Sequence, residues 1–130
     1  KKGAVTFTRY TSTDGLPDNW IQSIFEDNWG TLWVGTYNSL AKKKGDSFEV
    51  VDLYNSAPQN WAYTINQDRK NTMWFGSIGN GLIYNNGSSM RTLPESLNDY
   101  RISTIASYKD KTGALWFGTY EGGLWKYTPR

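Results

Sequence analysis

The 130-residue sequence contains no cysteine and no histidine. Without cysteine the chain has no disulfide bonds and no thiolate metal ligands, and its redox compartment cannot be read from the sequence. Without histidine it lacks the most common general base and metal ligand, which leaves carboxylates, lysines, tyrosines and hydroxyl groups for any chemistry. The sequence therefore predicts neither a metal site nor a bound cofactor.

The sequence also lacks long apolar runs and a strong net charge. No apolar segment approaches the length of a membrane span, and no signal peptide is recognisable. The net charge is +2, and the only charge run, Lys42–Lys44, is explained by a solvated turn. We therefore expect no membrane segment in this chain and no nucleic-acid partner, which would need a broader basic surface. The first residue is Lys1, which is typical of a processed, excised or engineered segment.

Aromatic residues and glycine are abundant. The chain has 7 Trp, 9 Tyr, 5 Phe and 13 Gly. Large rings favour strands, and glycine favours the tight turns that join them. The length suits one domain of ordinary size.

A short motif occurs three times: an apolar residue, Trp, an apolar residue, Gly, and Thr or Ser. Its tryptophans are Trp33, Trp74 and Trp116, which are 41 and 42 residues apart. An aspartate precedes each of them by six residues, at Asp27, Asp68 and Asp110. Each unit divides into four short strands separated by turn residues, and no segment has a convincing helical period. Four-stranded units of 40–45 residues in tandem are typical of β-propeller blades.

The predicted fold class is therefore all-β, with three four-stranded antiparallel blades per chain. The repeats cover residues 7–47, 48–89 and 90–130 approximately, within one propeller segment of residues 1–130. The chain begins with a lone outer-type strand, Val5–Tyr10, and ends after a third-type strand, Gly123–Tyr127. Three blades are too few for a ring, because propellers use about 4–8. We expect the ring to be completed in one of two ways. Either the chain forms a homo-oligomer, with a six-bladed dimer favoured, or the remaining blades belong to a parent propeller.

The segment GLPDNWIQSIFEDNWGTLWVGT, residues 15–36, resembles the repeat of the two-component regulator propeller family. Such repeats have Gly-Leu-Pro, an Ile strand, Glu-Asp, a glycine turn, and Leu-Trp followed by an apolar residue and Gly-Thr. The resemblance extends over nearly the whole chain as three repeats. Asn71 replaces the turn glycine in the second repeat, a mild change because Asn tolerates left-handed geometry. The hairpin also resembles the Asp-box of sialidase-type propellers, with an Asp-to-Gly spacing that differs by one.

The resemblance implies a ligand-sensing role. Such propellers commonly form the extracytoplasmic part of hybrid sensor kinases in gut and environmental bacteria, and many respond to breakdown products of polysaccharides. It therefore implies a periplasmic or extracellular sensor module for signal transduction, with an oligosaccharide as a possible ligand.

Blade topology predicts a ligand-binding face. The loops that enter the first strands and the loops between second and third strands open on the same side. The candidate ligand-binding residues there are Asn19, Trp20, Tyr37, Asn60, Trp61, Tyr100, Arg101 and Tyr120. Flat rings stack on the C–H surfaces of sugars, while amides and guanidinium groups bind hydroxyls or a carboxylate.

Each candidate also has a structural interpretation. The two tryptophans of this set could pack between blades, the two asparagines could form turns, and the tyrosines could flank turns. The motif tryptophans are different, because they lie mid-strand between blades. We expect all three to be buried, and we expect the motif aspartates to accept backbone hydrogen bonds in their hairpins.

The sequence gives no support for catalysis. Glu26 and Asp27 could serve as a carboxylate pair, but adjacent residues in a strand point to opposite faces and cannot flank one bond. Some antibiotic-cleaving lyases share the propeller architecture, but that chemistry needs a base and a metal cluster. We therefore expect a binding module, not an enzyme. The alternatives are a structural or self-assembling propeller fragment without a specific ligand, natural or engineered, and a small lectin.

Overall fold

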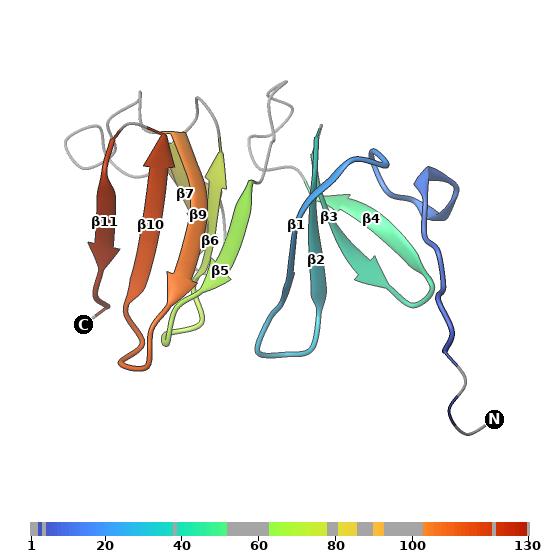
Figure 1. Ribbon diagram of the computed structural model, residues 1–130, viewed down its shortest axis with the longest axis horizontal. Helices are drawn as coiled ribbons and strands as arrows, with labels where there is room; N and C mark the ends of the chain where they lie inside the picture. Colours follow the sequence, from blue (N-terminus) through green and yellow to red (C-terminus); the bar gives the residue numbers. More distant parts are fainter. Residues whose placement is uncertain are drawn as a thin grey trace.

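A computed structural model describes residues 3, 5–37, 39–51, 63–77, 81–85, 90–92, 103–120 and 122–129. Within these residues the chain forms three antiparallel sheets and one short 3-10 helix, η1 (Ser12–Asp14). The sheets stand in a row, with the chain passing from one to the next (Figure 1).

Each sheet is a meander of consecutive strands. The first contains β1 (Ile21–Glu26), β2 (Leu32–Thr36), β3 (Leu40–Lys44) and β4 (Ser47–Val51). The second contains β5 (Thr64–Gln67), β6 (Met73–Ser77), β7 (Gly81–Asn85) and β8 (Met90–Thr92). The third contains β9 (Ser103–Lys109), β10 (Leu115–Tyr120) and β11 (Leu124–Tyr127). This arrangement confirms the predicted all-β class and the four-stranded blade unit.

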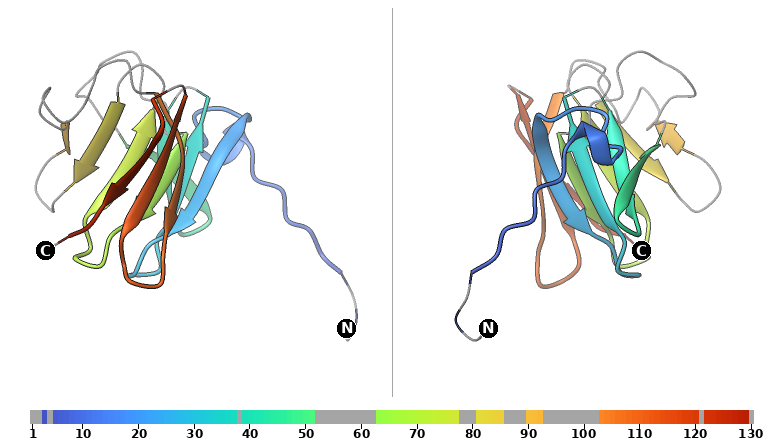
Figure 2. Two further views of the ribbon diagram at one scale, coloured as in Figure 1. Left: turned by 60° about the vertical axis from the view of Figure 1, so that its left-hand side comes forward. Right: turned by 90° about the vertical axis from the view of Figure 1, so that its right-hand side faces the viewer.

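The predicted strand at Val5–Tyr10 does not form. These residues have no ladder partner in the described part of the chain, and Phe7 is 92% exposed. The N-terminal segment extends away from the sheets (Figure 2). A strand exists only where a neighbour accepts and donates its backbone hydrogen bonds, so sequence pattern alone could not create one here. The third sheet correspondingly has three strands in the described residues, not four.

The lysine run lies in a strand, not in the turn that the sequence suggested. Lys42–Lys44 form the end of β3. The ammonium groups of the first two lie 5.7 Å from the Trp33 ring centre and 6.0 Å from that of Tyr10, respectively. Lys44 lies 3.8 Å from a carboxylate oxygen of Glu49 on the neighbouring strand. Long aliphatic stems allow lysine to cover apolar surface in a strand while the charge stays in solvent.

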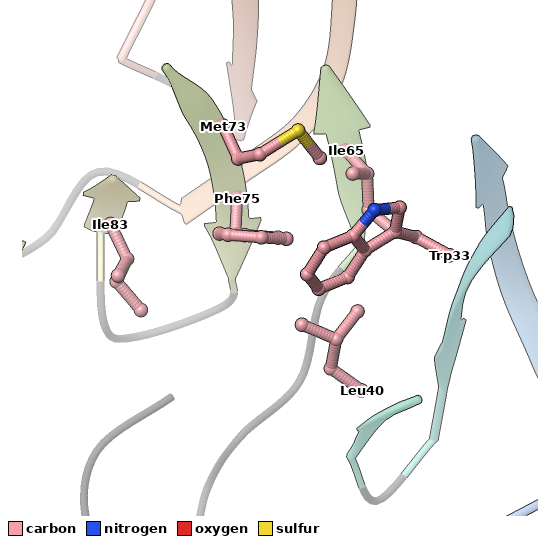
Figure 3. Close-up of a cluster of buried hydrophobic side chains, with 6 residues drawn as sticks. All are labelled: Trp33, Leu40, Ile65, Met73, Phe75 and Ile83. Atoms are coloured by element: carbon pink, nitrogen blue, oxygen red, sulfur yellow. The ribbon is translucent and has the colours of Figure 1, made fainter. Parts of the chain in front are cut away.

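Two clusters of buried hydrophobic side chains lie between the sheets, and a third, formed by Leu16, Val34, Ala41 and Phe48, lies on the outer face of the first sheet. Figure 3 shows the first interface, where side chains from two sheets meet: Trp33, Leu40, Ile65, Met73, Phe75 and Ile83. The second interface contains Trp74, Leu82, Leu115 and Phe117. In both, the motif tryptophan of one sheet contacts a phenylalanine of the next, at ring-centre distances of 5.6 Å for Trp33–Phe75 and 5.8 Å for Trp74–Phe117.

The third motif tryptophan breaks this pattern. Trp33 and Trp74 are buried as predicted, but Trp116 is only partly buried. Its sheet is the last in the row, so no further sheet covers the face from which it projects. The ammonium group of Lys126 lies 5.2 Å from its ring centre instead. The expectation of three buried tryptophans was therefore wrong at this position, because burial depends on a neighbouring blade.

The second and third sheets approach each other closely at the motif glycine Gly76. A Cβ atom on Gly76 would lie 2.7 Å from the methyl carbon of Thr104 and 2.8 Å from that of Thr64. Real Cβ atoms do not come so close to other carbons. The glycine of the motif therefore serves inter-blade packing.

Candidate ligand-binding face

The three aspartate hairpins share the same pattern of hydrogen bonds. In the first, Oδ1 of Asp27 accepts backbone hydrogen bonds from Trp29 and Thr31, both at 2.9 Å. Its other oxygen, Oδ2, accepts the indole N–H of Trp33 at 2.9 Å. Asp68 and Asp110 make the same three kinds of bond in their hairpins. The predicted backbone bonds are confirmed, whereas the indole bond was missed, although the constant six-residue spacing was a signal for it.

Hydrogen bonding lowers the pKa of two of these carboxyl groups. For Asp27, burial acts to raise the pKa, but bonds from Trp33, Thr31 and Trp29 outweigh it. For Asp110, the hydroxyl of Thr112 and the indole of Trp116 hold the pKa well below its usual range. Both aspartates are therefore ionised at neutral pH and accept hydrogen bonds, so their role is structural.

The hairpins also define the two ends of the blades. Asn28 in the first hairpin donates to Asn71 in the second at 2.6 Å, and Arg69 in the second donates to Thr112 in the third at 2.8 Å. All three hairpins therefore lie on one side, here called the hairpin side. The starts of the inner strands and the loops after β2 and β10 lie on the opposite side, the loop face, as the topology predicted.

Trp20 and Tyr37 meet on the loop face. Their rings are stacked, with centres 5.2 Å apart and planes inclined by 21°. The backbone N–H of Tyr37 donates to the carbonyl of Trp20 at 3.0 Å, which joins the two loops. Trp20 is 64% exposed. The pair presents an aromatic surface to solvent.

The loop before Trp20 is held by local hydrogen bonds. The Asn19 side-chain oxygen accepts the N–H of Ser12 at 2.8 Å, and the Asp18 carboxylate accepts the N–H of Trp20 at 2.8 Å. Gly15 has a φ of 102°, and a Cβ there would lie 2.2 Å from the carbonyl oxygen of Phe48. The glycine of the Gly-Leu-Pro motif is therefore needed where this loop contacts β4. The Asn19 side chain thus makes a hydrogen bond within its own loop.

The loops after the second strands are held by the last residue of the repeated motif. The Thr36 hydroxyl donates to the carbonyl of Ser39 at 2.9 Å, and the Thr119 hydroxyl donates to the carbonyl of Gly123 at 2.7 Å. The residues that follow are Tyr37 and Tyr120, so these threonines fix the loops that carry two predicted site residues. Sequence reasoning missed this role, although the recurrence of Thr or Ser at this position was a signal.

The other predicted site residues are placed as follows. Tyr120 ends β10 on the loop face and is exposed, two sheets away from the Trp20–Tyr37 pair. Four candidates lie outside the described residues: Asn60, Trp61, Tyr100 and Arg101. The structure therefore brings Trp20 and Tyr37 into contact and puts Tyr120 on the same side.

The hairpin side carries a pocket that the sequence did not suggest. A pocket of about 260 Å³ opens between the first two sheets. It is lined by Asp27, Trp29, Thr31, Trp33, Lys42, Asn71, Met73 and Asn85. Sequence reasoning did not predict it, because its wall combines residues from two blades. Among the described residues, no group of three or more acidic residues is arranged as a metal site, and no helix is long and apolar enough to cross a membrane.

These sheets define the chain as a segment of a β-propeller. Residues 15–38 match the family model described as two component regulator propeller. The matched residues contain the Gly-Leu-Pro turn, the first aspartate hairpin and the first Trp motif. A comparison with curated protein sequences found no significant match.

Solved structures with the same fold include extracellular domains of two component systems. One is the extracellular domain assigned to the hybrid two component system BT4673 from B. thetaiotaomicron, with 24% identity and a TM-score of 0.74. A second is the extracellular domain assigned to the hybrid two component system BT3049 from the same organism, with 22% identity and a TM-score of 0.68. Each match covers 93% of this chain, but only 17% and 18% of the solved chains, respectively.

A third match is an enzyme. Virginiamycin B lyase from Staphylococcus aureus is 16% identical, with a TM-score of 0.56 over 85% of this chain and 42% of the lyase. These likenesses establish the β-propeller fold of the segment.

Proposed function

We propose that this chain is a ligand-binding module of a sensor-type propeller, and that it recognises an oligosaccharide or a similar polar small molecule on its loop face. The observation that carries the proposal is the exposed, stacked pair of Trp20 and Tyr37. An exposed indole held at a fixed position is the kind of surface on which the C–H face of a pyranose ring stacks.

The rigidity of this pair supports a binding role. Backbone bonds to Asp18 and from Tyr37 hold Trp20, and the Thr36 hydroxyl fixes the loop that carries Tyr37. Preorganised rings lose little conformational entropy when a ligand binds, which favours affinity from few contacts. Binding residues are commonly found on loops that a rigid scaffold positions.

The family repeat and the structural neighbours support the sensor context. Two of the neighbours are extracellular domains assigned to hybrid two component systems. By analogy, we propose a periplasmic or extracellular location and a role in signal transduction. The proposal is of a binder without catalytic activity, because the three hairpin aspartates are committed to hydrogen bonds within the scaffold.

The proposal is tested by binding measurements with matched tryptophan variants. A glycan array identifies candidate oligosaccharides, and calorimetry then compares the unmodified chain with Trp20→Ala and Trp29→Ala. Trp29 is 67% exposed, close to the 64% of Trp20, but it lies in the hairpin at the other end of β1. We expect Trp20→Ala to weaken binding by about tenfold or more, as loss of a stacking contact does. We expect Trp29→Ala to leave affinity unchanged.

Two results would contradict the proposal. If Trp20→Ala and Tyr37→Ala leave the affinity for every detected glycan unchanged, the loop face is not the binding site. If Trp29→Ala abolishes binding instead, the ligand occupies the pocket on the hairpin side, which Trp29 lines. Circular dichroism of each variant shows that the sheets are intact.

A further inference from the structure

The pocket between the first two sheets has the features of a second binding site. It has a volume of about 260 Å³ and opens on the hairpin side, away from the Trp20–Tyr37 pair. Its lining includes the buried side chains of Trp33 and Met73, which come from facing sheets (Figure 3). The exposed indole of Trp29 also lines it. Both walls of the pocket are therefore supplied by the described part of this chain.

The interface between the second and third sheets contains an equivalent place, and the strand register identifies its residues. In the first sheet Lys42 pairs with the motif tryptophan, Trp33. In the second sheet Tyr84 pairs with the motif tryptophan, Trp74. Tyr84 therefore occupies, at the second interface, the position that Lys42 has in the pocket.

The opposite wall of the pocket differs in the same way. Asn85 lines the pocket and pairs with Met73, the residue before the motif tryptophan of the second sheet. In the third sheet Tyr127 pairs with Leu115, the residue before the motif tryptophan there. Tyr127 is therefore the equivalent of Asn85. A lysine and an asparagine at the first interface correspond to two tyrosines at the second.

The two tyrosine rings fill the equivalent place at the second interface. The ring centres of Tyr84 and Tyr127 lie 5.2 Å and 4.7 Å from that of Trp74. Burial and the nearby Asp68 carboxylate raise the pKa of Tyr127, as expected for a phenol packed beside that aspartate. At the first interface no ring comes from these two positions, and the space beside Trp33 is the pocket.

The pocket also contains hydrogen-bond donors that the scaffold does not use. The Lys42 ammonium group lies 5.7 Å from the Trp33 ring centre and has no ion-pair or hydrogen-bond partner among the described residues. Asp27 is buried, and its two oxygens already accept three hydrogen bonds. The indole N–H of Trp29 has no partner in the same part of the chain. An ammonium group and an indole N–H are therefore available to an acceptor on a bound molecule.

We propose that this pocket binds a small aromatic acid, with its ring against Trp33 in the place that Tyr127 fills at the second interface and its carboxylate on the ammonium group of Lys42. A cavity of about 150 Å³ holds benzene, so about 260 Å³ has room for one ring and its substituents. Ring–ring contact and a partly buried ion pair both contribute to affinity. The site is separate from the loop face and does not rest on the function proposed for it.

The first test compares three small molecules by calorimetry. 4-Hydroxybenzoate, which combines the phenol of a tyrosine with a carboxylate, is expected to bind one-to-one with a dissociation constant of about 1 mM or below. Cyclohexanecarboxylate keeps the charge without the aromatic ring, and 4-hydroxybenzyl alcohol keeps the ring without the charge. We expect each to bind about fivefold or more weakly. No saturation by 4-hydroxybenzoate at about 10 mM, or equal binding of all three, would overturn the proposal.

The second test fills the pocket from within the chain. Asn85→Tyr introduces at the first interface the side chain that Tyr127 provides at the second, and we expect it to abolish binding of 4-hydroxybenzoate. Asn85→Ala is the matched control, because it removes the same amide but leaves the pocket open, and it should retain binding. Circular dichroism shows whether the sheets of both variants are intact. Undiminished binding by folded Asn85→Tyr, or equal loss in the two variants, would contradict the proposed position of the ring.

The third test removes the charge of the pocket. Lys42→Met keeps an aliphatic stem over Trp33, and we expect it to weaken binding of 4-hydroxybenzoate about tenfold while leaving that of 4-hydroxybenzyl alcohol unchanged. Lys43→Met is the control, because this lysine lies on the other face of β3, with its ammonium group 6.0 Å from the Tyr10 ring centre. Trp20→Ala, on the loop face, should also leave binding of the acid unchanged. Equal losses in the two lysine variants, or loss in Trp20→Ala, would refute the assignment to this pocket.

Discussion

The indole N–H of Trp33 donates a 2.9 Å hydrogen bond to Oδ2 of Asp27, six residues earlier in the chain. The same bond joins Trp74 to Asp68 at 3.0 Å and Trp116 to Asp110 at 2.8 Å. The motif thus couples a hairpin turn to an inter-blade side chain. One carboxylate caps the turn with its first oxygen and orients the tryptophan with its second.

Loss of a hairpin carboxylate should destabilise the fold. Asp68→Ala removes the acceptor for Trp74, Lys70 and Thr72, and leaves a buried indole N–H without its partner. We expect a loss of about 1–3 kcal/mol in the free energy of unfolding, measured by urea denaturation. Asp46→Ala, at an exposed turn between β3 and β4, is the control and is expected to change stability little. Equal effects of the two substitutions would contradict the assigned role.

The two tryptophans of the same motif should differ in their contribution to stability. Trp74 is buried between two sheets, whereas Trp116 is partly exposed on the outer face of the third sheet. Trp74→Ala is expected to cost about 3–5 kcal/mol, as truncation of a buried ring does. Trp116→Ala is expected to cost clearly less at concentrations where the chain sediments as a monomer. Thermal unfolding followed by circular dichroism provides the comparison, and similar losses would contradict the expected difference between the two tryptophans.

A methyl group should be tolerated at one motif glycine and not at another. Gly76→Ala places a Cβ within 2.8 Å of two threonine side chains at the interface between the second and third sheets. At Gly118 the same atom meets only the Cβ of Ala106, at an ordinary 3.5 Å. We expect Gly76→Ala to lower the free energy of unfolding by about 1–3 kcal/mol and Gly118→Ala to have little effect in the monomer. Equal destabilisation in urea unfolding would argue against close packing at Gly76.

Acid should destabilise the chain through the hairpin carboxylates. The folded pKa of Asp27 and of Asp110 lies below the ordinary value, so the folded state favours their ionised forms. Their contribution is fully present above the unfolded pKa of about 4 and is lost as the pH falls through the folded values. We expect the urea midpoint to be stable at neutral pH and to fall steadily below about pH 4.

The Thr112 hydroxyl provides the control for this pH dependence. It donates to Oδ1 of Asp110 at 2.6 Å and is the largest cause of the lowered pKa. Thr112→Val keeps the carboxylate but removes this bond, so the decline below about pH 4 should become shallower. An unchanged pH profile in the variant would show that Asp110 does not contribute to the acid sensitivity.

The sequence alone predicted the blade. Recurrence of the aspartate and the Trp motif at intervals of 41 and 42 residues predicted three four-stranded units; three sheets form, two of them with four strands and the third with three in the described residues. It also predicted the backbone bonds of the hairpins and the left-handed residue Asn71, which has a φ of 71°. These features are local, because each is decided by residues a few positions apart.

The candidate site was only partly predictable. The sequence placed Trp20 and Tyr37 on one face, because strand direction decides the side on which each loop lies. It could not show that their rings stack, since that contact depends on the backbone bond between two loops. The pocket on the hairpin side was missed for a related reason, because its wall is assembled from two blades.

Tertiary structure decided which equivalent residues are buried. Leu40 and Leu124 occupy the same position in their blades, and only the presence of a neighbouring sheet separates full burial from exposure. For the same reason Val5–Tyr10 has the sequence of an outer strand but pairs with no strand in the described part of the chain. Propensity specifies the local conformation that a segment can adopt. A hydrogen-bonded partner and a packed neighbour decide whether it becomes part of a blade.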